Sequence, residues 1–396
     1  MEGREGRRVV VTGFGVVAPC GIGKDAFWAG LLGPNASGKN TTVIDGWDPA
    51  PYFDSPKDAR RTDRFQQFAM AAAAEAFDHS GRPTVDPARF GVIVGTGVGG
   101  LETLEEQIQI RLEKGERRVS PFLVPMMMSN AAGAAISMRY GLQGPCETII
   151  TACAASTHAI GAAARTIVWG RCDAVVSGGS EAAATPTGIA GFHNMTALST
   201  SGSSRPFDAN RDGFVLGEGA GVIILEELSV ARARGAAIYG EILGAASNAD
   251  AHHITAPAPG GTGAIACMEL ALIDAGLRPS DIVHINAHGT STPLNDAAEA
   301  EAITKVFGNP GPAVTSTKGV TGHALGAAGA LEAVAVLLAM QHKLIPPTAG
   351  TTDVDPAVSI DLVLGAARAW EPGPTMSNSF GFGGHNGSII IGPPPA

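Results

Sequence analysis

Cys153 has the local setting that most favours chemistry in this chain. It follows an expected strand at 147–151 and opens an expected helix at 154–169. A thiol at a helix N-terminus is stabilised as the thiolate by the helix dipole and the free backbone amides. The strand–thiol–helix turn also exposes the sulfur and leaves the cysteine N–H free to face an oxyanion. The pattern favours a nucleophile, although the usual free cysteine is simply a small buried side chain.

Two histidines in the second half of the chain are candidate partners for this thiol. His288 ends an expected strand at 282–287, and strand ends are where α/β folds build their sites. His323 precedes a small-residue helix at 325–341 and takes the place in the second half that Cys153 takes in the first. In a pseudo-symmetric fold, one thiol and two imidazoles would therefore share a pocket. The spacing is not that of a zinc motif, so we expect no metal.

Two charged residues and an aromatic one lie close to these candidates. Lys318 and Glu332 flank His323, and they are either a buried ion pair or two separate surface charges. Phe382 lies among the glycines of 378–387, which permit an unusual and mobile backbone path. A mobile aromatic side chain beside a thiol is suited to act as a gate, whereas the plainer interpretation is an ordinary glycine-rich turn.

Two glycine-rich stretches are similar to nucleotide-binding loops, but we do not expect either to bind phosphate. The stretch 13–18 follows a strand and matches a dinucleotide fingerprint. Pro19 then breaks the helix that would receive the pyrophosphate. The stretch 95–100 lacks the Gly-Lys-Ser/Thr of a phosphate loop. Close backbone packing in a turn is the favoured interpretation there.

Short β-branched strands alternate with alanine-rich helices along the chain, which predicts a layered α/β fold. The expected strands are 8–12, 91–95, 147–151, 174–178, 221–226, 282–287 and 387–391. The expected helices are 66–79, 127–139, 154–169, 263–276, 296–307 and 325–341. Because the helix at 154–169 is apolar almost all round, we expect it to lie between layers.

One supersecondary pattern occurs twice. The segments 70–97 and 268–290 each read as an alanine-rich helix, a turn with Asp and Gly, and a strand ending in Gly-Thr. Each is followed by a stretch that closes with a small-residue helix, at 152–169 and 322–341. We interpret this as a duplicated fold with pseudo-twofold symmetry, the alternative being chance similarity between two α/β units.

Composition excludes several classes of protein. The 396 residues are 45% hydrophobic and 16% charged, which disfavours disorder and is enough for two domains or one large duplicated one. The net charge of −10 disfavours nucleic-acid binding through bulk positive charge. We find no apolar run of membrane-spanning length and no signal peptide in the polar start, so we expect no membrane partner. Five cysteines without a CxxC pair predict free thiols in a reducing, cytoplasmic compartment.

Taken together, these residues resemble the elongating β-ketoacyl-acyl-carrier-protein synthases of the thiolase-like superfamily, with most likeness to the synthase II group. The resemblance runs over nearly the whole chain. It rests on the motifs VVTGFG at 10–15, TACAAS at 151–156, SRPFD at 204–208, RDGFVLGEG at 211–219, NAHGTSTP at 286–293, STKGVTGH at 316–323 and NSFGFGG at 378–384. It implies a duplicated five-layer α/β/α/β/α fold. The half with the nucleophile would be 1–240, and the half with the catalytic histidines 241–396.

The resemblance also implies a role for each site residue. The nucleophile falls on Cys153, the two catalytic histidines on His288 and His323, and the lysine with its glutamate partner on Lys318 and Glu332. Backbone N–H groups of Cys153 and Phe382 would form the oxyanion hole, and Phe382 would also be the gate. Other matched positions are the pantetheine-binding hydroxyls Thr290 and Thr292, the substrate contacts Leu104 and Phe380, and the supporting carboxylates Asp250 and Asp296.

The implied reaction is a decarboxylative Claisen condensation that elongates an acyl chain held on the cysteine. It requires no metal and no cofactor, because the phosphopantetheine arm arrives on the carrier-protein substrate. One alternative is the ketosynthase subunit of a type II polyketide synthase. Another is a non-catalytic partner subunit, which the intact Cys153, His288 and His323 argue against.

The implied partners are an acyl carrier protein and a second copy of the chain in a homodimer. Carrier proteins are acidic, as is this chain, so docking requires a local basic patch. Two stretches offer one: Arg60, Arg61 and Arg64, and Lys114 with Arg117 and Arg118. The plainer interpretation of both is solvated surface charge.

Overall fold

The computed structural model describes residues 6–36 and 41–396, and its large sheet contains two series of five strands. The first series is β1 (Val9–Ala18), β4 (Phe90–Gly95), β5 (Cys146–Ile149), β6 (Ala174–Glu181) and β8 (Gly219–Glu227). The second is β9 (Gly240–Ala249), β10 (His284–Asn286), β11 (Ala313–Thr315), β15 (Thr375–Gly381) and β16 (His385–Gly392). The short strands are β2 (Gly21–Ile22), β3 (Thr41–Thr42), β7 (Leu216–Gly217), β12 (Leu344–Ile345), β13 (Asp361–Leu362) and β14 (Arg368–Ala369).

The two series have the same topology. Their orders in the sheet are β5-β4-β6-β8-β1 and β11-β10-β15-β16-β9, so each runs third, second, fourth, fifth, first. In both, the second strand is parallel to the third and fourth, and the fifth is antiparallel to both of its neighbours. This repeated order confirms the predicted duplication. The antiparallel pairing of β1 with β9 joins the two series.

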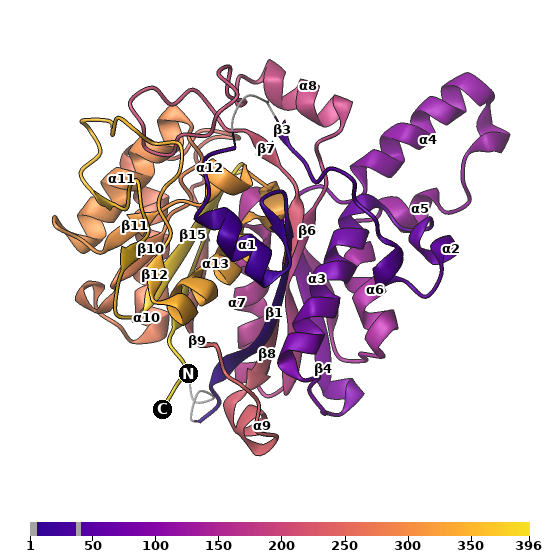
Figure 1. Ribbon diagram of the computed structural model, residues 1–396, viewed down its shortest axis with the longest axis horizontal. Coiled ribbons are helices and arrows are strands. Elements are labelled where there is room, and N and C mark those ends of the chain that lie inside the picture. The colour runs from indigo at the N-terminus through magenta and orange to yellow at the C-terminus, as the bar shows by residue number, and fades with distance from the viewer. Residues whose placement is uncertain (1–5, 37–40) are drawn as a thin grey trace.

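Helices form the layers around and between the two series. The longer ones are α3 (Arg64–Ser80), α4 (Leu101–Lys114), α6 (Ala131–Tyr140), α7 (Ala155–Val168), α10 (Thr262–Ala275), α11 (Pro293–Phe307) and α13 (Ala328–His342). The shorter ones are α1 (Lys24–Leu31), α2 (Pro56–Ala59), α5 (Leu123–Met127), α8 (Pro186–Asn194), α9 (Leu228–Ala233) and α12 (Lys318–Thr321). Helix α3 packs on β1 and β8, and α10 packs on β9 and β16. Helices α7 and α13 contact each other and strands of both series, so they form the central layer of a five-layer fold (Figure 1).

Helix α13 shows why this central layer can exist. Every residue from Ala328 to Met340 is buried, because the helix is enclosed by strands of both series. The segment Leu325–His342 is long and apolar enough to cross a membrane by length and composition, contrary to the expectation that no run reaches that length. Since 89% of this window is buried in the protein, it is a core helix of the fold.

The glycines of the dinucleotide-like stretch serve helix packing. Gly13 and Gly15 lie within β1, under helix α3. A Cβ at Gly15 would lie 2.1 Å from the carbonyl oxygen of Ala72, and one at Gly13 would lie 2.5 Å from that of Ala76. Gly95, at the end of β4, is similarly covered by Ala155 of α7. These glycines allow helices to approach the strands closely. Close packing is thus a sufficient reason for the glycines in both stretches.

All the predicted helices and strands are present, with differences at their bounds, and further elements occur that were not predicted. The predicted helix at 127–139 is divided, because α5 ends at Met127 and α6 begins at Ala131. The strands β9, β11 and β15, the helix α4 and most of the shorter helices and strands were not predicted. Strand β9 reads GEILGAASNA, and its small and polar residues hide the alternation that marks a strand.

We predict that Gly15→Ala destabilises the protein by about 1–3 kcal/mol, because its methyl group would overlap the backbone of α3. Gly191→Ala is the control: Gly191 is in helix α8 and an added Cβ there meets nothing within 4 Å. That change should alter stability by no more than about 1 kcal/mol, in the stabilising direction. Denaturant unfolding of both variants measures the difference, and equal stabilities would contradict the packing argument.

Candidate active site

Cys153 lies in a strained turn between β5 and α7. A 3₁₀ turn, η4 (Ala152–Ala154), precedes α7, and Ala152 has a φ of 50°. A second 3₁₀ turn, η7 (Leu325–Ala327), precedes α13 in the same way, and Leu325 has a φ of 45°. The two turns contact each other, so the starts of the two central helices meet as predicted. The counterpart of Cys153 in the second turn is Gly326. The sequence predicted His323 as this counterpart, but His323 lies three residues before it.

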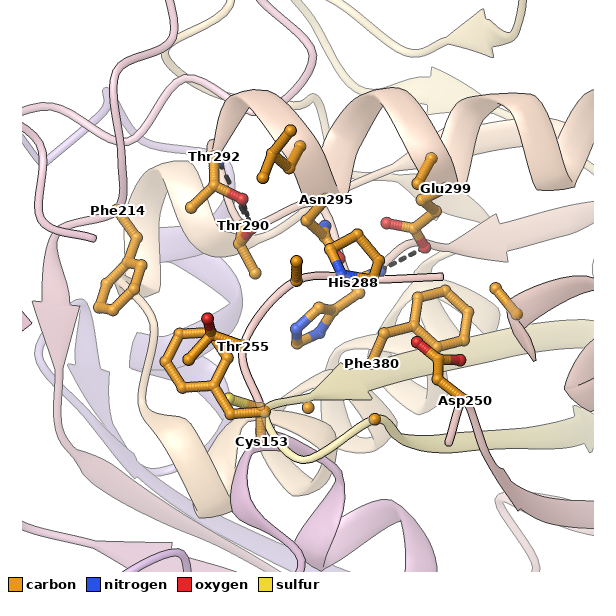
Figure 2. Close-up of a pocket in the computed structure, with 18 of the residues that line it drawn as sticks. Cys153, Phe214, Asp250, Thr255, His288, Thr290, Thr292, Asn295, Glu299 and Phe380 are labelled. Carbon is orange, nitrogen blue, oxygen red and sulfur yellow. Dashed lines mark hydrogen bonds between the residues drawn. The ribbon is translucent and has the colours of Figure 1, made fainter. Parts of the chain in front are cut away.

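The thiol and the two imidazoles converge on one space. Cys153 Sγ lies 3.1 Å from His323 Nε2, and both side chains are buried. The rings of His288 and His323 are 5.3 Å apart and nearly perpendicular. Phe214 contacts the other side of His323 edge-on at 5.0 Å. Figure 2 shows Cys153, His288 and Phe380 facing the same cavity.

Lys318 lies behind His288 and forms the predicted buried ion pair with Glu332. Its Nζ donates to the carbonyl oxygen of His288 at 2.6 Å and lies 3.4 Å from His288 Nδ1. An ammonium group can only donate, so Nδ1 must be the acceptor and the imidazole proton must be on Nε2. His288 Nε2 has no partner among the described residues. Its N–H is therefore available to a substrate oxygen.

Burial keeps the Cys153 thiol and the imidazoles of His288 and His323 uncharged. It raises the pKa of the Cys153 thiol to about 11, against the opposing effects of the Lys318 charge and the Phe382 backbone N–H. This corrects the expectation of a resting thiolate, because desolvation outweighs the helix terminus. Burial, followed by the charge of Lys318, also holds the pKa of His288 and of His323 well below the ordinary value. At neutral pH the site therefore contains a thiol and two neutral imidazoles.

The same three side chains are a donor set that zinc would accept by type. The possible ligand atoms of Cys153, His288 and His323 lie within 4.8 Å of one another. A metal ligand needs a free lone pair, however, and His288 Nε2 carries the proton because Nδ1 faces an ammonium. The hydrogen bonding therefore suits a donor to an oxyanion better than a metal ligand.

The hairpin between β15 and β16 supplies the second wall around the sulfur. Gly381 is packed so closely that an added Cβ would lie 3.0 Å from the backbone nitrogen of Cys153. The backbone N–H of Phe382 lies near the thiol and acts to lower its pKa. Gly383 and Gly384 follow with φ of 82° and 73°, which glycine adopts at little cost. The N–H groups of Cys153 and Phe382 thus lie at the same sulfur, as an oxyanion hole requires.

A cavity of about 350 Å³ opens onto these groups. On one side it is lined by Thr290 and Thr292, whose hydroxyl oxygens are 3.0 Å apart, and Phe380 also lines it. On another side it is apolar, with Phe192, Phe214 and Leu325. Among the described residues that line this cavity, Leu104 is not present. Leu101, one turn earlier in α4, instead packs with the apolar cluster around Cys153.

Three carboxylates hold the loops around the cavity. Asp250 accepts from the Ala258 backbone at 3.0 Å and the Asn386 amide at 2.6 Å, and it lines the cavity. Asp296 is fully buried and accepts from the backbone of Phe207 at 2.8 Å. It also accepts from the Ser291 backbone, in the turn that follows His288.

Glu299 is the supporting carboxylate that the sequence did not reveal. It accepts from the backbone N–H of His288 at 2.8 Å and of Gly289 at 2.7 Å, as Figure 2 shows for His288. Burial raises its pKa to about 7. The only sequence signal was its spacing, one helical turn after Asp296 in an alanine-rich helix, which places both carboxylates on one face.

The basic residues predicted to dock a partner have different surroundings. Arg60, Arg117 and Arg118 are exposed, and Arg61 is exposed with its guanidinium 4.3 Å from the centre of the Phe122 ring. Lys114 ends α4 and is exposed too. Arg64 differs from the prediction, because its guanidinium points inward to Glu218 at 2.6 Å and to the carbonyl oxygen of Ile44. Its guanidinium is thus held by contacts within the protein, which brace the start of α3.

Comparison with known proteins agrees with this arrangement. Residues 33–231 match the model of the beta-ketoacyl synthase N-terminal domain, and residues 239–352 match that of the C-terminal domain. The chain is 44% identical to the 3-oxoacyl-[acyl-carrier-protein] synthase 2 of Synechocystis sp., over 99% of both chains. The structure of a beta-ketoacyl synthase from Burkholderia phymatum superposes with a TM-score of 0.91 at 35% identity, covering 98% of this chain and 100% of the other.

A second solved structure shows a relative with its partner. It is a type II polyketide ketosynthase in complex with an acyl carrier protein and bound to the hexaketide. The TM-score is 0.90 at 32% identity, covering 98% of this chain and 100% of that one.

We predict that alkylation of Cys153 by iodoacetamide accelerates about tenfold per pH unit between about pH 7 and 9. A pKa near 11 leaves the reactive thiolate scarce, and its fraction rises with pH throughout this window. Mass spectrometry of the peptide that contains Cys153 measures the rate and separates it from the exposed Cys146. A rate that levels off near neutral pH would contradict the buried neutral thiol.

Proposed function

The chain belongs to the beta-ketoacyl synthase family, and from this membership we propose how its residues divide the work of the reaction. It is an acyltransferase of the 3-oxoacyl-[acyl-carrier-protein] synthase 2 type, which performs a decarboxylative condensation that elongates fatty acyl chains. One observation carries the residue assignments: the Cys153 thiol lies 3.1 Å from His323 and faces the same cavity as the His288 N–H.

The first step transfers an acyl group to Cys153. The sulfur attacks the acyl thioester while His323 Nε2 accepts the thiol proton, which a thiol of pKa near 11 cannot lose on its own at neutral pH. The N–H groups of Cys153 and Phe382 stabilise the oxyanion of this step. The proton leaves with the released pantetheine thiol, and the acyl group stays on Sγ.

The second step generates the carbon nucleophile. A malonyl thioester loses CO₂, and negative charge develops on its thioester oxygen. The His288 Nε2–H donates to that oxygen, and His323, free of the thiol after acylation, faces the same space. The pair of Lys318 and Glu332 keeps His288 in the donating tautomer, so these two residues position the imidazole. The enolate carbon then attacks the acyl carbonyl, the bond from the carbonyl carbon to Sγ breaks, and the released Cys153 thiolate takes up a proton from solvent to restore the thiol.

The two ends of the cavity differ in a way that assigns the substrate its orientation. The hydroxyls of Thr290 and Thr292 suit the amide-bearing phosphopantetheine arm, with Phe380 beside it. The apolar end suits the acyl chain. Asp250 and Asp296 anchor loops around the cavity, because their carboxylates accept hydrogen bonds from the backbone N–H groups of Ala258 and Phe207. Phe382, flanked by glycines beside the sulfur, is placed to be the gate between acylation and malonyl entry.

The acyl carrier protein is the proposed partner, with docking on the exposed arginines Arg60, Arg61, Arg117 and Arg118. A relative whose solved structure is a complex with its carrier protein supports this kind of partner. We also propose a homodimer, a cytoplasmic location, and no cofactor beyond the arm of the substrate. The halves would divide at 240/241, where β9 begins the second series of strands.

Polyketide assembly is the second candidate function, and the likeness to a type II polyketide ketosynthase favours it. That likeness is 32% identity, against 44% for the fatty-acid-type relative. A silent partner subunit is disfavoured, because the thiol, both imidazoles and the lysine are assembled within reach of one another.

We predict that Cys153→Ala lowers condensation by about a thousandfold or more, because the acyl-enzyme cannot form. Cys153→Gln, whose side chain is similar to an acylated cysteine, should retain malonyl decarboxylation while losing condensation. Product analysis by mass spectrometry with acyl and malonyl carrier-protein thioesters measures both activities. Persistent condensation in the alanine variant would overturn the assignment of the nucleophile.

Reversal of Arg117 and Arg118 to Glu should raise KM for the carrier-protein substrate about fivefold, since two exposed charges would repel the acidic partner. A free pantetheine thioester lacks the partner surface and should be used as before. Steady-state kinetics with both substrates, and at two salt concentrations, separate the effects. If both substrates were affected equally, the two arginines would not belong to a docking surface.

A further inference from the structure

A third histidine, His158, bridges two segments beside the active site. It lies in the first turn of the central helix α7, which packs against strand β16. Its Nδ1 is 2.9 Å from the hydroxyl oxygen of Thr151, and its Nε2 is 2.9 Å from the carbonyl oxygen of Asn386. One imidazole therefore connects the segment just before Cys153 with a strand from the other half of the chain.

The two contacts fix the tautomer of His158 and the direction of both hydrogen bonds. A carbonyl oxygen can only accept, so Nε2 carries the proton and donates it to Asn386. Nδ1 then offers a lone pair, and the Thr151 hydroxyl donates to it. Burial lowers the pKa of His158, which favours the neutral ring that this arrangement needs. Both nitrogens are therefore used within the protein.

The Thr151 end of this bridge belongs to the turn that carries the nucleophile. The carbonyl oxygen of Thr151 accepts from the backbone N–H of Ala154 at 3.1 Å, which closes the turn around Cys153. Ala152 in the same turn has a positive φ, and such a conformation persists only where the surrounding structure holds it. The hydrogen bond from the Thr151 side chain to the imidazole is one such support, and it helps to fix the direction of the Cys153 N–H.

The Asn386 end of the bridge belongs to the hairpin that carries the second donor. Asn386 pairs with Phe380 across the hairpin, and the turn between the two strands contains Phe382. Gly387, the next residue of β16, is packed so closely that an added Cβ would be 2.8 Å from the His158 ring. The ring thus contacts the base of the hairpin directly, and its position decides how far the hairpin lies from α7.

The proposed oxyanion hole takes one N–H from each end of this bridge. The Cys153 N–H comes from the turn and the Phe382 N–H from the hairpin. Both donors must lie about 2.7–3.1 Å from the oxyanion, so a small change in the spacing of turn and hairpin removes much of the stabilisation. The two segments already meet at Gly381, where an added Cβ would be 3.0 Å from the Cys153 nitrogen. A contact that holds this spacing therefore bears directly on the acyl-transfer steps.

We propose that His158 is a positioning residue that sets the spacing of the two oxyanion-hole donors by bridging Thr151 and Asn386. This inference rests on the proposed condensing function. The role differs from those of His288 and His323, because His158 is not among the described residues that line the cavity. It acts only through the backbone of the turn and the hairpin, and it matters for the steps in which the acyl carbonyl becomes an oxyanion.

The test compares two reactions of the same sulfur. Acyl transfer from a short acyl-pantetheine thioester passes through an oxyanion, whereas alkylation by iodoacetamide displaces iodide from a saturated carbon and forms none. His158→Phe keeps a ring but neither hydrogen bond. It should slow acylation of Cys153 about ten- to hundredfold and change alkylation by less than about twofold. Mass spectrometry of the peptide that contains Cys153 measures both rates. Unchanged acylation, or equal slowing of both reactions, would overturn the proposal.

His284→Phe is the matched control. His284 is also buried, and neither of its ring nitrogens has a hydrogen-bond partner among the described residues. Loss of its imidazole removes a buried histidine without breaking such a bridge, so the ratio of acylation to alkylation should match that of the wild type. A fall in this ratio as large as that of His158→Phe would show a general effect of core substitution and would overturn the specific role.

Thr151→Val breaks the bridge at its other end and carries the test if His158→Phe does not fold. It should lower the ratio of acylation to alkylation in the same direction. The double variant should acylate no more slowly than His158→Phe alone, because both changes remove one bridge. Additive losses in the double variant would overturn the bridge. Absence of condensation by the wild type would overturn the proposed function, whereas the two reactions of the sulfur would still measure the role of His158.

Discussion

The buried ammonium of Lys318 sets the chemistry of this site. It is paired with Glu332 and donates to the carbonyl oxygen of His288, so its own charge is compensated within the protein core. Its position 3.4 Å from Nδ1 decides which nitrogen of His288 carries the proton. It also opposes protonation of both imidazoles, which keeps them as hydrogen-bond donors and not as acids that would quench a carbanion. The remaining groups act within the conditions that this one charge imposes.

Duplication explains how these groups come together. Each half delivers a short 3₁₀ turn with one residue at positive φ, followed by a helix that enters the central layer. The first half places a thiol on its turn. The second half places a glycine there and supplies its chemistry from flanking segments, with His323 before the turn and His288 after a strand. A symmetric frame thus holds an asymmetric set of reactive groups.

Features that depend on local sequence pattern could be predicted from the sequence alone. Cys153 was found from its strand–thiol–helix context, and the duplication from the repeated helix–turn–strand segments. Contacts that depend on the tertiary fold could not be predicted from such local patterns. Arg64 was grouped with its neighbours, but its guanidinium faces Glu218. Leu104 was predicted to contact the substrate, but Leu101, one turn earlier, is the residue that packs in the cluster around Cys153. The thiol was expected to be ionised because burial by the second half of the chain leaves no local signal.

The pairing of β1 with β9, together with the meeting of η4 and η7, has a consequence for synthesis on the ribosome. The nucleophile and its base are 170 residues apart in the chain, and strands of the second half complete the sheet in which the first half is embedded. A nascent chain therefore emerges with its thiol long before the imidazoles exist, and contacts of such long range form slowly. A chain arrested midway carries Cys153 without the groups that bury it, orient it or accept its proton. The complete set of thiol, base and hydrogen-bond donor therefore exists only after the second half of the chain has folded against the first.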